Sequence, residues 1–463
     1  MSDELTIAAA GDLIAQRKLS PVELTKMHLD RITRLDATLH AFICVTAERA
    51  IADAKKAEAA IMAGRHVGPL HGIPIGHKDI FDTRGIPTTA HSRLLQGHVP
   101  PSDATVVARL ADAGTVLLGK LAAHEFAWGG PSFDLPWPPA RNPWDPACFT
   151  GGSSSGSGAA VAAGLVLGCT GSNTGGSIRM PAGLCGVVGF KPSYGLCSGA
   201  GAFPLAHSLD HPGPMAWTVE DCAILLQAMA GHDPQDPASV DVALPDYRRE
   251  LERPIAGLRI GFVRHFHEAD APASNAVKRA LDDAVAVFRG LGAEVRDIVL
   301  PSLADWGACG MIILMAEAHA LHETWLRTRI RDYGEIFRDR VALGALVGAA
   351  DYLAAQRMRT ELCKTFAKAM RDVDVLLCAN MPDGAPPIGA VTKMGTFEKP
   401  NFSFPFNVTG APALALRAGF TERGMPLGMQ LAGRPFEDAA VLRAGHHYER
   451  ATGWAARRPS LRS

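Results

Sequence analysis

Two glycine- and serine-rich stretches stand in the middle of this sequence: GGSSSGSGAAVAAG at residues 151–164 and GSNTGGSIRMPAG at residues 171–183. Consecutive glycines allow several backbone N–H groups to point into one cavity, because no side chain blocks them, and such a nest binds negative charge. The first stretch runs directly into the Ala/Gly-rich segment 159–164, and tryptophans stand nearby at 128, 137 and 144. We therefore expect ordered loops packed on the start of a helix rather than a flexible linker.

Strand and helix patterns alternate on both sides of these loops. Residues 73–81 form a short apolar segment that predicts a strand, residues 104–113 predict a helix, and residues 115–119 predict a buried strand. Residues 4–63 and 310–370 have the periodicity of helices, and short apolar segments return near the C-terminus. This alternation predicts an α/β fold.

The composition excludes several classes of protein. Of the 463 residues, 47% are hydrophobic and 20% are charged, with a formal net charge of −1, which favours a globular protein without a broad surface for nucleic acid or anionic membranes. The nine cysteines show neither a CxxC pair nor zinc-ligand spacing, and the N-terminus lacks the pattern of a secretory signal. We expect a cytoplasmic protein that acts on a small molecule.

The glycine loops and a lysine together suggest nucleophilic catalysis. A serine hydroxyl attacks poorly unless a neighbouring group removes its proton. Lys78 can be that base, because burial in its apolar strand penalises the charged ammonium, and a second serine can relay the proton. If Ser177 attacks a carbonyl, the N–H groups placed to hold the oxyanion are those of Thr174, Gly175, Gly176 and Ser177. The residues alone do not decide between Ser177 and Ser154 as nucleophile.

Two other interpretations of the loops are weaker. GSSSG at residues 152–156 matches the G-x-S-x-G nucleophile elbow, with Ser154 at its centre and His207 or His211 as its base. The elbow needs a strand directly before it, and residues 146–150 predict a poor one. No G-x-x-x-x-G-K-[ST] motif is present, so a nucleotide-binding loop is not supported.

Together, the motifs resemble the amidase signature family. GIPIGHKD at 72–79 is similar to its lysine strand, residues 151–164 to its first serine loop and residues 171–195 to its second. The match continues through FNVTGAPAL at 406–414 and GMPLGMQLAGRPFEDAAVLRA at 424–444. The resemblance implies a single domain over 1–463 with a large mixed β-sheet covered by helices on both faces. Within it, residues 1–66 would form a helical scaffold and residues 72–195 would carry the catalytic motifs.

The resemblance also assigns roles. It makes Ser177 the nucleophile, Ser153 the bridging serine and Lys78 the base of the relay, and the two serines are 177 − 153 = 24 residues apart, as in the family. It implies an acyl-enzyme that water hydrolyses, without cofactor or metal. The residues expected to support the loops are Ser154, Asn173 and Arg179. Asn173 departs from the aspartate usual in the family, and we expect activity to survive this change.

The substrate is less determined than the reaction. Segment 125–134 stands where relatives line the substrate cavity, and its aromatic residues favour an apolar or aromatic amide, anilide or carbamate, although core packing explains them equally well. The expected substrate-binding residues are Phe126, Trp128, Gly129, Gly130 and Phe133.

An alternative is the glutamine-hydrolysing amidase subunit of a glutamyl-tRNA amidotransferase-type complex. Its glutamine site would need an acid shortly before residues 406–414, where only Glu398 stands. We therefore favour an independent hydrolase whose partner is a small amide-like molecule, with neither nucleic acid nor membrane, and leave a homodimer open.

Overall fold

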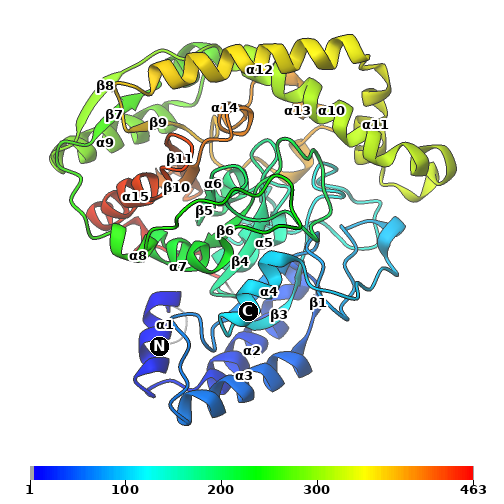
Figure 1. The fold of residues 1–463 in the computed structure, drawn as a ribbon, viewed down its shortest axis with the longest axis vertical. Coiled ribbons are helices and arrows are strands. Elements are labelled where there is room, and N and C mark those ends of the chain that lie inside the picture. The colour runs from blue at the N-terminus through cyan, green and yellow to red at the C-terminus, as the bar shows by residue number, and fades with distance from the viewer. Residues whose placement is uncertain (1–4, 462–463) are drawn as a thin grey trace.

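The computed structural model describes residues 5–461, and their strands form one mixed β-sheet. The strands are β1 Phe42–Val45, β2 Pro74–Lys78, β3 Val116–Leu121, β4 Gly168–Ser172, β5 Val188–Lys191, β6 Pro212–Ala216, β7 Arg259–Phe262, β8 Glu294–Asp297, β9 Val375–Ala379, β10 Ala413–Phe420 and β11 Pro426–Ala432. Within the described residues the sheet has 11 strands in the order β1-β3-β2-β4-β6-β5-β10-β11-β9-β7-β8 (Figure 1). The prediction of a large mixed sheet is confirmed.

Helices cover both faces of the sheet. They are α1 Ile7–Ala15, α2 Pro21–Leu39, α3 Ala47–Met62, α4 Thr105–Asp112, α5 Ser155–Ala162, α6 Arg179–Cys185, α7 Val219–Met229, α8 Tyr247–Glu250, α9 Asn275–Gly290, α10 Leu303–Thr328, α11 Glu335–Ala342, α12 Ala349–Ala369, α13 Gly395–Glu398, α14 Phe404–Val408 and α15 Asp438–Thr452. In β10, Leu414 packs closely against Gly445 of α15, whereas its neighbour Ala415 packs in one cluster with Ala182 of α6. Successive strand residues point to opposite faces, so α15 and α6 lie on opposite sides of the sheet.

The parallel central strands bring the catalytic candidates together. β2 pairs in parallel with both β3 and β4, and every residue of these three strands is buried, as expected for strands covered on both faces. Lys78 is the last residue of β2 and Ser172 the last of β4. Because parallel neighbours end at the same edge of a sheet, these two side chains meet there.

Two expected helical regions are interrupted. Residues 4–63 contain the edge strand β1, which pairs antiparallel with β3, between α2 and α3. The region 310–370 is divided among α10, α11 and α12, and α10 begins earlier than expected because Ser302 caps it by accepting a hydrogen bond from the N–H of Asp305. Tertiary pairing and local caps decided these boundaries, which periodicity does not report.

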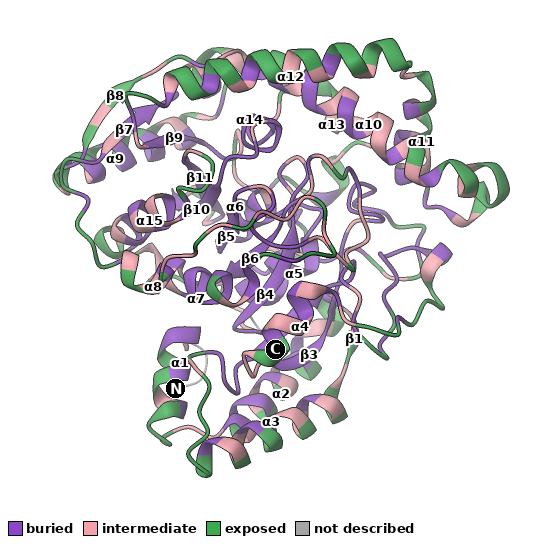
Figure 2. Ribbon diagram, in the orientation of Figure 1, coloured by how far each residue is buried: buried purple, intermediate pink, exposed green. Residues whose placement is uncertain are grey.

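The peripheral helices lie at the two ends of the molecule. In Figure 1 the blue helices α1–α3 occupy the lower end and the yellow-green helices α10–α12 the upper end. Figure 2 shows the central strands almost entirely buried and α12 exposed along its outer side. Among residues 5–461, no helix is both long and apolar enough to cross a membrane.

Candidate active site

The lysine and two serines form a compact hydrogen-bonded group. The Nζ atom of Lys78 donates to the Oγ atom of Ser153 at 2.7 Å and to the Oγ atom of Ser172 at 2.8 Å. Lys78 is fully buried. Ser153 and Ser177 line the same cavity, of about 210 Å³. The structure thus joins Lys78 to Ser153 by a hydrogen bond, places Ser177 in the same cavity as Ser153, and adds Ser172 to the group.

The environment of Lys78 suits a base. Burial lowers the pKa of Lys78 to about 7, and the negative charge of Asp210 opposes this shift. A lysine with this pKa is substantially neutral near pH 7 and can accept a proton, whereas an exposed lysine cannot.

The second glycine loop contributes residues to the lining of this cavity. Its lining residues here are Thr174, Gly175, Gly176 and Ser177. Within residues 5–461, no hydrogen bond uses the backbone N–H groups of these four residues. Gly176 has φ +132°, a conformation that favours glycine, and a Cβ atom there would lie 3.1 Å from Ser403. Free N–H groups on a glycine-rich loop of the cavity lining are what the predicted oxyanion-binding nest requires.

The residues expected to support the loops are buried and link them. The N–H of Ser154 donates to the carbonyl oxygen of Ser177 at 3.1 Å, which joins the two serine loops. The Oδ1 atom of Asn173 accepts the N–H of Ile178 at 2.9 Å. Arg179 donates to Gln430 Oε1 at 2.8 Å and to the Ser403 carbonyl at 3.1 Å. These contacts tie the loop that carries Ser177 to β11 and to Ser403, the residue before α14.

The structure does not assemble a nucleophile elbow. Ser154 is the residue before α5, and the residues that precede it form turns rather than a strand. The Nδ1 atom of His211 contacts the carbonyl oxygens of Leu209 at 2.7 Å and Asn173 at 3.2 Å. His207 lines a different and larger cavity.

Segment 125–134 contributes unevenly to the catalytic cavity. Trp128 and Gly130 line it. Phe126 is instead fully buried among other aromatic rings, including that of Phe337, which also packs on Gly129. Phe133 is 62% exposed, with Arg141 over its ring, and does not line the cavity. The structure thus places two of these five residues where they can touch substrate.

Two titratable residues that line the cavity, His124 and Arg340, were not predicted from the sequence. His124 packs against the backbone of Gly152, beside Ser153, and burial, with the charges of Arg340 and Lys78, holds its pKa well below the usual value. Arg340 of α11 donates to the carbonyl oxygens of Trp128 and Lys393, and burial lowers its pKa to about 10, so it remains cationic at neutral pH. His124 adjoins the aromatic segment 125–134, whereas nothing local distinguishes Arg340.

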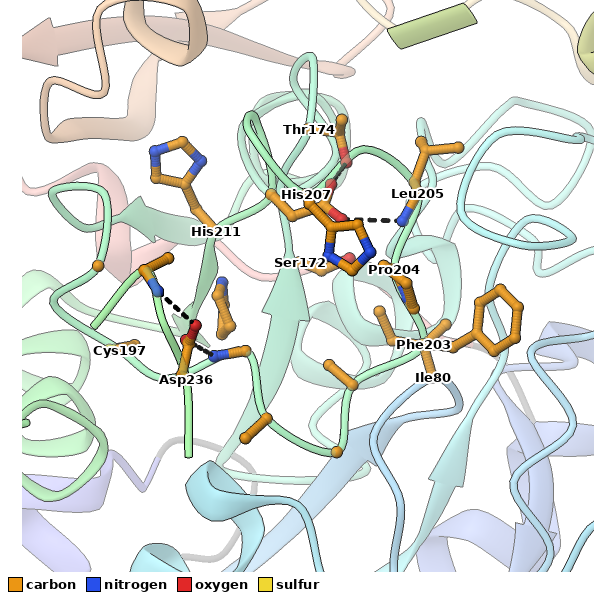
Figure 3. A pocket seen from close by; sticks show the side chains of 18 of the residues that line it. Ile80, Ser172, Thr174, Cys197, Phe203, Pro204, Leu205, His207, His211 and Asp236 are labelled. Atoms are coloured by element: carbon orange, nitrogen blue, oxygen red, sulfur yellow. Dashed lines mark hydrogen bonds between the residues drawn. The ribbon is translucent and has the colours of Figure 1, made fainter. Parts of the chain in front are cut away.

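A larger cavity lies behind the relay. It has a volume of about 850 Å³ and is lined by Ser172, His207, Asp210 and Asp236, among others (Figure 3). Three residues line both cavities: Ala127, Thr174 and Leu205. The wall between the cavities therefore includes Thr174, the first residue of the predicted oxyanion nest.

Comparisons with known proteins agree over nearly the whole chain. The amidase family model matches residues 23–442. The A subunit of the glutamyl-tRNA(Gln) amidotransferase of Geobacter metallireducens is 40% identical over 484 residues, covering 99% of each chain. A structure described as a vestigial protein complex that reveals the origins of an s-triazine catabolic enzyme has TM-score 0.91 and 36% identity, covering 99% of this chain and 100% of the other. The corresponding amidotransferase chain of Thermotoga maritima has TM-score 0.81 and 33% identity, covering 97% and 95%.

These relatives overturn the predicted partners. The sequence predicted a small molecule alone, without nucleic acid, and this prediction is wrong, because similar chains are subunits of an enzyme named for a tRNA, or come from a protein complex. The net charge of −1 argues only against direct binding of RNA by this chain. It does not exclude an association with RNA through partner subunits.

The family, by contrast, is the expected one. Motif order, fold and overall similarity agree: the chain belongs to the amidase signature family, whose members are enzymes that act on carbon–nitrogen bonds.

Proposed function

We propose that this chain hydrolyses an amide bond in a small molecule that carries a carboxylate, and that it works as the amidase subunit of a multi-subunit enzyme. The observation that carries this proposal is Arg340, a buried cation in the lining of the catalytic cavity. Within the described chain, Arg340 donates hydrogen bonds to two backbone carbonyl oxygens and has no carboxylate within ion-pair distance. A carboxylate on the substrate would supply the missing counterion, in the fork geometry that guanidinium favours.

The proposed reaction uses the relay residues in sequence. Neutral Lys78 accepts the Oγ proton of Ser153, which accepts the Oγ proton of Ser177 as that oxygen attacks the amide carbonyl carbon. The nest from Thr174 to Ser177 holds the oxyanion, and one such donor contributes on the order of 3 kcal/mol to transition-state stabilisation. The relay then returns the proton to the leaving nitrogen as the C–N bond breaks. Water hydrolyses the acyl-enzyme by the same path and releases the acid.

Glutamine, within a glutamyl-tRNA amidotransferase-type complex, is the first candidate substrate. Its support is the similarity to subunits of that name, at 40% identity over 99% of the chain. Glutamine also has the carboxylate that Arg340 would bind.

A carboxylate-bearing amide without an amino group is the second candidate. None of the residues that line the catalytic cavity within 5–461 is an aspartate or glutamate, so an ammonium group would find no counterion there. Glu398 is exposed and interacts with Thr392 at the cavity lining. This distribution of charge favours an anionic substrate over a zwitterion.

Ammonia release from matched amides tests both candidates. The substrates are glutamine, glutaramate, which is glutamine without its amino group, and glutaramide, which has no carboxylate. We expect glutaramate to be hydrolysed with higher kcat/KM than glutaramide. Glutamine hydrolysis that rises when the other amidotransferase subunits and tRNA are added would support the first candidate. The proposal would be refuted if glutaramide or an aryl amide were hydrolysed faster than both glutamine and glutaramate, the two substrates that carry a carboxylate.

A further inference from the structure

A carboxylate in the wall between the two cavities holds the oxyanion nest. The Oδ1 atom of Asp210 accepts a hydrogen bond from the Oγ1 atom of Thr174 at 2.5 Å. Its Oδ2 atom accepts the backbone N–H groups of Leu205 at 2.8 Å and Ala206 at 3.1 Å. Figure 3 shows Thr174 and Leu205, the two residues that these hydrogen bonds join, on the lining of the larger cavity. Asp210 thus fastens the start of the nest to a neighbouring turn.

The same carboxylate faces the relay. Asp210 and Ser172 line one cavity, and the hydroxyl of Ser172 accepts a hydrogen bond from Lys78 at 2.8 Å. The negative charge of Asp210 therefore favours the protonated lysine, while burial disfavours it. Exclusion of water raises the pKa of Asp210 to about 6, while the hydrogen bonds that its carboxylate accepts lower it. Asp210 is therefore mostly ionised at pH 7.

Few other titratable groups act on this pair. His207 interacts electrostatically with Asp210, as does Tyr194, which lines the same cavity. His124 faces Lys78 from the catalytic cavity, and its low pKa keeps it neutral. Asp210 is therefore the ionised group positioned to tune the lysine.

We propose that Asp210 is a positioning residue for amide hydrolysis, which holds the oxyanion nest through Thr174 and places a negative charge beside the Lys78 relay. This inference rests on the proposed roles of Lys78 and Ser177. Asp210 does not line the cavity that holds Ser153 and Ser177, so its effect reaches the chemistry through Thr174 and Lys78. It predicts two separable consequences, one of charge and one of anchoring.

The charge is tested by Asp210→Asn. Asparagine can turn its oxygen toward the backbone N–H groups and its NH₂ toward Thr174, so it keeps the anchoring contacts without the charge. The matched control is Asp236→Asn. Asp236 is another carboxylate of the same cavity, and it accepts hydrogen bonds from the N–H groups of Gly199 and Ala238. The measurement is the rate at which a fluorophosphonate labels Ser177, from pH 5 to 9, which needs no knowledge of the substrate.

We expect the rise of labelling with pH to occur at lower pH in Asp210→Asn than in the unchanged protein, because lysine loses its proton more readily without the negative charge. Asp236→Asn should keep the unchanged profile. An unmoved profile in Asp210→Asn, or an equal shift in Asp236→Asn, overturns the inference. An unchanged protein that is not labelled at Ser177 refutes the proposed nucleophile instead, so the two failures are distinguishable.

The anchoring is tested separately by Thr174→Val, which removes the hydroxyl but leaves Asp210 in place. We expect the plateau labelling rate to fall about tenfold, because the variant loses the hydrogen bond from Thr174 to the carboxylate of Asp210 that anchors the nest. Thr174→Ser keeps the hydroxyl and should restore the rate. Equal rates in Thr174→Val and Thr174→Ser contradict the anchoring role, even if Asp210→Asn fails to fold.

Discussion

Arg340→Met removes the guanidinium from the catalytic cavity and keeps most of the aliphatic stem. In the structure, the Nε atom of Arg340 donates to the carbonyl oxygen of Lys393, and its Nη1 atom donates one hydrogen to the carbonyl oxygen of Trp128. Of the five guanidinium N–H groups, three therefore stay available to a ligand. A substrate carboxylate can accept two of them side by side.

The expected loss follows from these contacts. Hydrogen bonds between charged groups contribute roughly 1.5–3 kcal/mol each, and some of that gain is recovered by water in the variant. We expect a net loss of about 3 kcal/mol, or about 100-fold in kcat/KM, for glutaramate. For glutaramide, which lacks the carboxylate, the variant should lose much less, because only the contacts with Lys393 and Trp128 are affected.

The measurement is steady-state ammonia release from glutaramate and from glutaramide by the unchanged protein and by Arg340→Met. Arg340→Lys is the matched control, because it keeps the positive charge but not the two parallel N–H groups of the guanidinium. Its kcat/KM for glutaramate should lie between those of the unchanged protein and Arg340→Met. An equal loss on both substrates would mean that Arg340 acts by holding the loops alone. No loss on glutaramate would refute carboxylate recognition by this residue.

Three further predictions concern the relay and the fold. Ser177→Ala should abolish both turnover and fluorophosphonate labelling, whereas peptide mapping of the unchanged protein should place the label on Ser177; a label on Ser154 would contradict the assignment. Since only neutral Lys78 accepts the relay proton and burial lowers its pKa to about 7, kcat/KM should rise with pH up to about 7 and then level off; a flat profile from pH 5 to 9 is the opposing result. The Nζ atom of Lys120 lies 3.1 Å from the buried carboxylate of Asp79. Lys120→Met leaves this carboxylate unpaired and should lower the free energy of urea unfolding by about 3–5 kcal/mol. Arg296→Met, at an exposed ion pair, should change it by less than about 1 kcal/mol.

Much of the fold was accessible from local pattern. The strand that ends at Lys78 and the helix that follows the first serine loop are short segments whose apolar runs and glycines report their own conformation. The edge strand Phe42–Val45 was not accessible, because four residues between two helices form a strand only when β3 is beside them to accept the pairing.

The candidate site divides in the same way. Ser153, Ser177 and the oxyanion nest lie in two glycine-rich loops whose order and spacing are recognisable in the amino-acid sequence. Arg340 was not recognisable there, since an arginine in an amphipathic helix is normally solvated, and its burial beside Trp128 depends on α11 packing over the cavity. The sequence-based preference for an apolar substrate followed from weighing aromatic residues without this cation.

Local sequence alone predicts the features that neighbouring residues can specify: glycine-rich loops able to form a nest of N–H donors, candidate serine nucleophiles within those loops, and a lysine in an apolar strand. The tertiary structure decided what depends on residues distant along the chain. It placed Lys78 within hydrogen-bonding distance of Ser153 and Ser172, lowered the pKa of that lysine to about 7 by excluding water, and set Asp210 in the larger cavity and Arg340 in the smaller one. The reason is physical: backbone conformation is set by neighbours in sequence, whereas desolvation and charge are set by neighbours in space.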